Sequence, residues 1–154
     1  MFPPHSIKLI RTDGGNKSFQ RLATELEEEL KIRDGKDHPF YAELNKAENI
    51  KYVILAYENN DAAGCGAIRH YTNDTVEVKR MYVVKDKRGK GIASLVLNDL
   101  ENWTKELGFK KMVLETGINQ PEAVSFYKKH GYKVIPNFGK YIGSENSICF
   151  EKNV

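Results

Sequence analysis

Glycines and cations alternate in one short stretch, directly before the strongest helical pattern of the chain. The stretch reads Lys85-Asp86-Lys87-Arg88-Gly89-Lys90-Gly91-Ile92-Ala93-Ser94. Glycines let a backbone come close to a ligand, and the free N–H groups and dipole of a first helical turn favour negative charge there. Lysine and arginine side chains add charge for further phosphates. The stretch therefore predicts an anion-binding turn, with a solvated surface loop as the plainer alternative.

Three classes of phosphate-bearing ligand come into question. A dinucleotide fold is disfavoured, because Gly89-x-Gly91 is followed by Ser94 where glycine or alanine belongs, and because only one crossover unit is present. A nucleic-acid groove would show interleaved aromatic residues and a broad basic surface, and a net charge of +3 is too small to suggest one. The turn best suits the pyrophosphate of another cofactor, and no nucleic-acid partner is expected.

Two segments together resemble the Gcn5-related N-acetyltransferase (GNAT) family. The first is Arg88-x-x-Gly91-x-Ala93 after the run 76–83, and the second is Glu115-Thr116-Gly117 followed by 120–132. Their spacing also matches the family. The resemblance implies a GNAT-like fold, acetyl-CoA as the cofactor, and transfer of its acetyl group to an amine. It also implies these cofactor contacts: Met81, Tyr82, Val83, Arg88, Gly89, Lys90, Gly91, Ile92, Ala93, Asn119, Gln120, Ala123 and Tyr127.

The second segment departs from the family at one position. Many members carry asparagine ahead of the second helix, where this chain has Gln120 with Asn119 beside it. Which of the two meets the pantetheine arm is therefore left open.

The strand before the turn contains a phase slip. Val76 and Val78 alternate with polar residues, but Lys79 and Arg80 are adjacent, and the apolar set resumes at Met81 in the other phase. A β-bulge near 79–81 would absorb the slip, with a plain exposed edge as the alternative. The resemblance implies the same bulge, beside which the strand separates from its parallel neighbour to admit the pantetheine arm.

Two residues are candidates for the chemistry of acetyl transfer. By resemblance, Tyr127 lies where a phenol can give its proton to the leaving sulfur, although its helical face would equally suit a core aromatic. Glu77, in the bulged strand, is the candidate base for the acceptor amine, with a surface glutamate as the alternative. No metal is needed, and no metal site is expected.

Aromatic residues on two loops are the candidates for acceptor binding. They are Phe40, Tyr41, Phe138 and Tyr141. Such a lining suits a small amine or amino compound, and it would also serve as an ordinary hydrophobic anchor. The alternatives are a protein or peptide N-acetyltransferase, which needs an open groove, and an acyl-CoA-binding sensor without turnover.

The hydrophobic periodicity indicates the elements that carry these residues. We expect helices where apolar residues recur at steps of three and four, and strands where they alternate. The expected helices are 16–30, 40–45, 91–107 and 121–130, and the expected strands are 7–10, 52–57, 63–71, 75–84, 111–115, 132–135 and 147–151. The run from 75 to 115 forms a right-handed parallel crossover. These elements predict an α/β (α+β) fold with a mixed, mostly antiparallel sheet of six to seven strands and helices on both faces.

Length and composition place limits on the whole protein. A chain of 154 residues predicts one domain over residues 1–154. No stretch approaches the roughly 18 apolar residues of a membrane span, and no secretory signal is evident, so we expect a cytoplasmic protein without a membrane partner. Cys65 and Cys149 lack metal or redox spacing and are expected to be buried thiols. A homodimer is neither indicated nor excluded.

Overall fold

The computed structural model describes residues 6–34 and 50–154, and the helix expected at 40–45 lies outside these ranges. Within them, every expected strand and the three other expected helices are present, with bounds that differ by a few residues. The elements are β1 (Ile7–Thr12), α1 (Lys17–Asp34), β2 (Tyr52–Glu58), β3 (Asp61–Thr72), β4 (Thr75–Val83), η2 (Lys85–Lys87), α3 (Ile92–Glu106), β5 (Lys111–Gly117), α4 (Pro121–Lys129), β6 (Lys133–Ile135), η3 (Gly139–Tyr141) and β7 (Ser147–Asn153).

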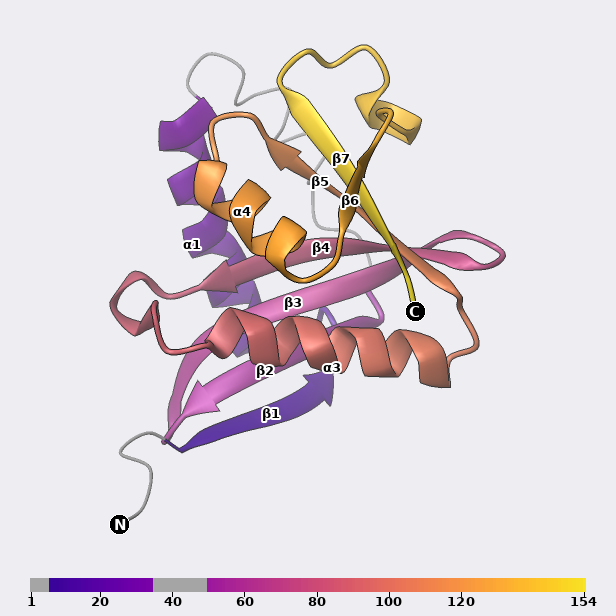
Figure 1. Cartoon of the computed structure of the whole chain (residues 1–154). Coiled ribbons are helices and arrows are strands. Elements are labelled where there is room, and N and C mark those ends of the chain that lie inside the picture. Colours follow the sequence, from indigo (N-terminus) through magenta and orange to yellow (C-terminus); the bar gives the residue numbers. More distant parts are fainter. Residues whose placement is uncertain (1–5, 35–49) are drawn as a thin grey trace.

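The strands form a seven-stranded sheet with the order β1-β2-β3-β4-β5-β7-β6. Every neighbouring pair is antiparallel except β4 and β5, which are parallel and joined by the crossover through α3. The mixed, mostly antiparallel sheet expected from the sequence is confirmed. The last hairpin inserts β7 between β5 and β6 (Figure 1).

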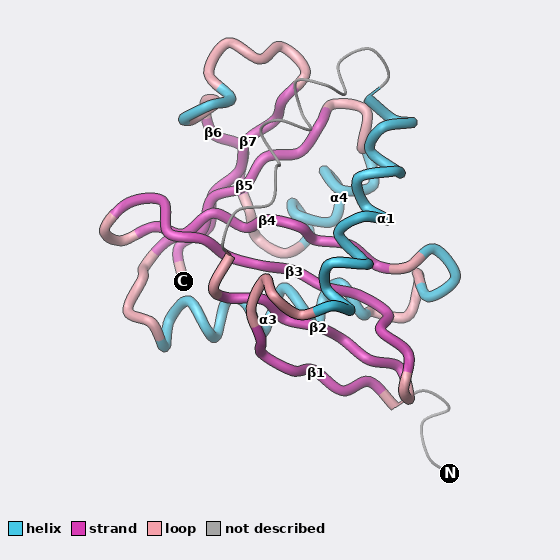
Figure 2. Tube along the Cα trace, turned by 180° about the vertical axis from the view of Figure 1, so that it is seen from behind, coloured by secondary structure: helices cyan, strands magenta, loops and turns pink. Residues whose placement is uncertain are grey.

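Helices cover both faces of the sheet, with α3 and α4 on one face and α1 on the other (Figures 1 and 2). Each helix buries its apolar stripe, as an amphipathic helix must. On the α3 face, Val96, Leu97 and Leu100 are fully buried within the larger core cluster. On the α1 face, Phe19 and Leu22 pack in a second cluster. No helix in the described ranges is long and apolar enough to cross a membrane.

The parallel strands β4 and β5 stay together over only three residue pairs and then separate. The last paired residues are Glu77 and Val113. Beyond them the two strands diverge, as Figure 1 shows, while β4 stays paired with β3 and β5 with β7. This divergence opens the sheet between its four-stranded and three-stranded halves.

A β-bulge in β4 lies at the point of divergence, where the phase slip predicted it. The register against β3 shifts between Cys65 and Ala67, so that Gly66 faces both Arg80 and Met81. Arg80 has φ 60°, a left-handed conformation that is uncommon for a residue other than glycine. A Cβ at Gly66 would lie only 2.5 Å from the Met81 sulfur, so glycine leaves room for the Met81 side chain of the bulged strand.

Candidate active site

The turn between η2 and α3 has the geometry of an anion cradle. Gly89 and Gly91 both adopt φ 82°, and a Cβ at either position would meet nothing within 4 Å. Gly91 is the N-cap of α3, and no side chain caps the helix there. The N–H groups of the first helical turn therefore stay available to a ligand that approaches this open surface.

A cavity of about 420 Å³ opens beside the cradle, between α1, the end of β4 and α4. Most of the predicted cofactor contacts line it, namely Met81, Tyr82, Val83, Arg88, Gly89, Gly91, Ile92, Ala93, Gln120, Ala123 and Tyr127. Of the two residues left open by the sequence, Gln120 is thus on the cavity wall. The Asn119 amide instead donates to the backbone oxygen of Arg33 at 3.4 Å.

Lys90 is also absent from the wall of this cavity, and its ammonium group pairs with a buried carboxylate. Glu58, at the end of β2, is 3% exposed and contacts the ammonium groups of Lys87 at 2.8 Å and of Lys90 at 3.0 Å. The hydrogen bonds from Lys87 and then Lys90 lower the pKa of Glu58 to about 2. Glu58 therefore holds the ammonium groups of two lysines of the cradle, Lys87 and Lys90.

Charged side chains of α1 reach across the same cavity. The Arg88 guanidinium contacts Glu29 at 2.7 Å and also donates to the backbone oxygen of Val83 at 2.9 Å. One turn further along α1, Arg33 pairs with Glu122 of α4. Sequence reasoning missed Glu29 and Arg33, because only the folded chain brings α1 beside the cradle.

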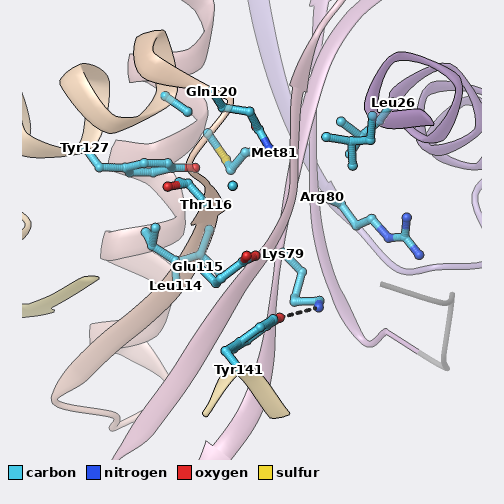
Figure 3. Close-up of a pocket in the computed structure, with 14 residues that line it drawn as sticks. Leu26, Lys79, Arg80, Met81, Leu114, Glu115, Thr116, Gln120, Tyr127 and Tyr141 are labelled. Carbon is cyan, nitrogen blue, oxygen red and sulfur yellow. Dashed lines mark hydrogen bonds between the residues drawn. The ribbon is translucent and has the colours of Figure 1, made fainter. Parts of the chain in front are cut away.

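A second cavity of about 120 Å³ adjoins the first where β4 and β5 diverge (Figure 3). The residues that line both cavities are Leu26, Leu30, Met81, Gln120, Ala123 and Tyr127. The remaining wall comes from β4, β5 and the segment before β7: Val78, Lys79, Arg80, Leu114, Glu115, Thr116, Gly117 and Tyr141. The two cavities form one path from the cradle into the gap in the sheet.

Tyr127 lies at the junction of the two cavities. It is 6% exposed and packs against the rings of Tyr132 and Phe150, and no hydrogen bond of its hydroxyl is recorded within the described residues. Burial raises the pKa of this phenol. Figure 3 shows its oxygen directed toward the space between the strands. The position leaves the hydroxyl free to meet a ligand group in that space.

Glu77 is buried at 6% exposure, so it is not the surface residue that the alternative interpretation allowed. It does not line either cavity. The Tyr141 hydroxyl, which does, donates to the Glu77 carboxylate at 2.9 Å, and the Lys79 ammonium lies 3.9 Å from the same oxygen. Burial lowers the pKa of Lys79, while the charge of Glu77 opposes that shift. Glu77 is thus connected to the cavity wall by its hydrogen bond with Tyr141.

The aromatic residues expected to bind the acceptor fall into two groups. Tyr141 is in the cavity wall, and Phe138 supports it from behind, with ring centroids 5.3 Å apart. Phe138 also packs edge-on against Tyr71. Phe40 and Tyr41 lie outside the described residues.

Several wall residues of the inner cavity were not expected from the sequence. Leu26 and Leu30 lie in the helix expected at 16–30, where apolar residues at steps of three and four indicate packing, and Lys79 was assigned only to the phase slip. The polar character of Lys79 within a strand was the one available signal. Glu115 and Thr116 lie in the second family-like segment, where no role was assigned to them.

A cradle for phosphate joined to a narrow path between two diverging strands defines a protein that binds a phosphate-bearing cofactor in an extended form. A sequence profile of the acetyltransferase (GNAT) family matches residues 17–132. The chain belongs to this family.

Individual relatives agree with this assignment. The chain is 33% identical over 100 residues to a protein of Azospirillum brasilense named IAA acetyltransferase; the match covers 64% of this chain and 65% of that one, so it spans just under two thirds of the relative. A GNAT-family acetyltransferase of Elizabethkingia anophelis, solved with acetyl-CoA bound, superposes with a TM-score of 0.68 at 21% identity, covering 96% of this chain and 98% of that one. A GNAT acetyltransferase of Staphylococcus aureus gives 0.71 at 19%, covering 96% and 99%. At such identities the likeness to solved structures concerns the fold.

The described residues fit acetyl-CoA on three observations. The glycine cradle is open where pyrophosphate would lie. The path between β4 and β5 is lined by apolar side chains such as Met81 and Ala123, which suit an extended, mostly uncharged arm. A residue of the inner wall, Thr116, also has a buried hydroxyl oxygen without a hydrogen-bond partner within the described residues.

Proposed function

We propose that the protein transfers the acetyl group of acetyl-CoA to the amine of a small molecule by direct transfer. The observation that carries the proposal is the size of the inner cavity, about 120 Å³, with buried Lys79 and Tyr141 in its wall. Pockets for drug-sized ligands measure roughly 300–1,000 Å³. A cavity below that range, which also admits the thiol end of the cofactor, suits a small amine better than a peptide.

The chain's own residues divide the work of such a reaction. Acetyl-CoA supplies, when bound, an acetyl thioester as the electrophile. The bulge at Arg80 releases part of β4 from its ladder, so a backbone N–H there can stabilise negative charge on the acetyl oxygen. Tyr127 gives its hydroxyl proton to the leaving sulfur and is reprotonated by the second proton that the acceptor nitrogen loses as the amide forms. Glu77 receives the acceptor's ammonium proton through the Tyr141 hydroxyl, to which it is hydrogen-bonded at 2.9 Å.

Release of free thiol from acetyl-CoA tests the proposal across a panel of small amines, amino acids and peptides. Small amines should give turnover. The Tyr127→Phe variant, which should be slower, is the control. Turnover with peptides alone would favour a protein or peptide acetyltransferase. Tight acetyl-CoA binding without turnover on any acceptor would instead favour an acyl-CoA sensor.

A further inference from the structure

A buried threonine in the wall of the inner cavity has a hydroxyl without a hydrogen-bond partner among the described residues. Thr116, in β5, is 4% exposed, and its Oγ1 has no hydrogen bond within the described residues. A buried hydroxyl without a partner costs free energy, because it has lost its hydrogen bonds to water and gained none. Such groups are rare in folded proteins and call for a specific explanation.

Other buried threonines of the described chain show how the hydroxyl is normally satisfied. Thr104 is 0% exposed and donates to the backbone oxygen of Leu100 at 2.7 Å. Thr75 is 6% exposed and donates to the carboxylate of Asp74 at 2.8 Å. Thr116 differs from both, although its burial is similar.

Packing does not explain why position 116 carries a hydroxyl. Thr116 follows Met112 and Leu114 on the same face of β5, and both of these belong to the main core cluster. Valine has nearly the same shape and suits a strand at least as well. The feature that threonine adds at this position is therefore a hydrogen-bonding group without a protein partner.

The surroundings of this hydroxyl indicate what it meets. Thr116 lies in the wall of the inner cavity together with Gln120, Ala123 and Tyr127, which also line the outer cavity (Figure 3). A cofactor arm that passes this junction carries amide groups and a thioester carbonyl, and these also lose water on entering a path lined by Met81 and Leu114.

We propose that Thr116 is a cofactor-positioning residue whose hydroxyl forms a hydrogen bond with an amide or carbonyl group at the thiol end of acetyl-CoA. The bond satisfies two groups that are both desolvated, one from the protein and one from the ligand. The proposal rests on the assignment of acetyl-CoA as donor and does not depend on the acceptor. In the ligand-free protein the hydroxyl without a partner lowers stability, and in the complex its hydrogen bond to the ligand strengthens binding.

This opposition between stability and binding gives the test, which compares Thr116→Val with Thr116→Ser by calorimetry, using acetyl-CoA and CoA without an acceptor. Thr116→Val should raise the Kd for acetyl-CoA about tenfold, equivalent to about 1.4 kcal/mol. Thr116→Ser, which keeps the hydroxyl, should bind within about threefold of the wild type. The thermal midpoint of ligand-free Thr116→Val should be equal to or above that of the wild type.

A comparison of CoA with acetyl-CoA shows which part of the cofactor contacts Thr116. An equal loss for CoA and acetyl-CoA assigns the bond to the pantetheine arm, and a loss for acetyl-CoA alone assigns it to the acetyl carbonyl. Thr104→Val is the matched control, because it removes a satisfied hydroxyl. It should lower the midpoint and leave both Kd values unchanged.

Two results would overturn the proposal. One is wild-type affinity of Thr116→Val for both ligands. The other is a fall in stability of Thr116→Val that matches that of Thr104→Val, which would mean that the hydroxyl has a structural partner. Should the valine variant not fold, Thr116→Ala against Thr116→Ser gives the same comparison. All readouts are binding and unfolding, so a failure to find turnover with any amine leaves the result interpretable.

Discussion

The hydroxyl of Tyr141 donates a hydrogen bond of 2.9 Å to the carboxylate of Glu77, and so connects a wall of the inner cavity to a buried base behind it. Burial, followed by the nearby charge of Glu77, raises the pKa of Tyr141. A phenol held in this way stays protonated at neutral pH, so it can receive a proton from one side only as it passes its own to Glu77. In the proposed reaction, this pair would carry the acceptor proton out of a cavity that Glu77 itself does not line.

Replacing Glu77 with glutamine should lower turnover about 100-fold at saturating acetyl-CoA, because the variant keeps the shape and loses the base. In the wild type the rate should rise with pH along an acidic limb, and in Glu77→Gln the plateau of that profile should fall. Steady-state kinetics across pH measure both. Tyr141→Phe, which removes the connecting hydroxyl, is the companion variant and should also lower the plateau. If neither the plateau nor the acceptor's KM changes in folded Glu77→Gln, another group removes the proton.

Replacing Tyr127 with phenylalanine should reduce turnover about 100-fold and leave the Kd for acetyl-CoA within about twofold. The ring contacts with Tyr132 and Phe150 are kept, and no hydrogen bond of the hydroxyl within the described residues is lost, so the thermal midpoint should not fall. Single-turnover kinetics, in which chemistry limits the rate, provide the measurement. Full activity under those conditions would make Tyr127 a packing residue.

Replacing Gly91 with aspartate should weaken acetyl-CoA binding by 100-fold or more, about 2.7 kcal/mol, because the side chain adds negative charge at the cradle and strains a backbone with φ 82°. Gly91→Ala is the control, since alanine brings the strain without the charge. We expect it to bind more weakly than the wild type and more tightly than Gly91→Asp. Calorimetry that finds unchanged affinity in a folded aspartate variant would exclude this turn as the pyrophosphate site.

Replacing Gly66 with alanine should destabilise the protein by about 1–3 kcal/mol, the usual cost of overpacking a core. The added Cβ would lie 2.5 Å from the Met81 sulfur and 2.8 Å and 2.9 Å from side-chain carbons of Val96 and Leu100, so these side chains must shift. Because Met81 lines both cavities, acetyl-CoA affinity should fall together with stability. Gly108→Ala, at a helix end where a Cβ would meet nothing within 4 Å, should lose stability alone. An alanine at 66 without effect on either quantity would contradict this account of the bulge.

The ion pairs of Glu58 should make stability depend on pH in the acid range. Its pKa is about 2 in the folded protein and 4.5 when unperturbed, so the unfolded state binds the proton first as pH falls. The contribution is therefore complete above about pH 4.5 and is lost progressively toward pH 2. Urea unfolding across this range should show that wild-type stability falls more steeply than that of Glu58→Gln, and that the two converge near pH 2. Parallel curves would mean that Lys87 and Lys90 do not hold this carboxylate in solution.

The sequence predicted the sheet, the crossover and the cradle because each depends on local patterns. Alternation and three-to-four periodicity report which face of an element is buried, and the phase slip at Lys79 and Arg80 was enough to locate the bulge. The part of α1 that lines the cavities could not be predicted in the same way. Leu30 satisfies a core pattern equally well whether it meets a sheet or a ligand, and Arg33 looks like any solvated helix residue. The role of Thr116 could not be predicted for a different reason: only the folded structure shows that its hydroxyl has no hydrogen-bond partner among the described residues.

The short pairing of β4 with β5 also bears on how the molecule holds together. Only three residue pairs join the four-stranded half of the sheet to the three-stranded half, and beyond Glu77 and Val113 the ladder is missing. A cofactor arm in that gap would bridge the two halves, in the place where a further run of interstrand hydrogen bonds would otherwise be. Bound acetyl-CoA would thus also help to hold the two halves of the sheet together. Amide hydrogens beside the gap in β4 and β5 should then exchange more slowly when acetyl-CoA is bound. Their exchange should become faster again when the product is released.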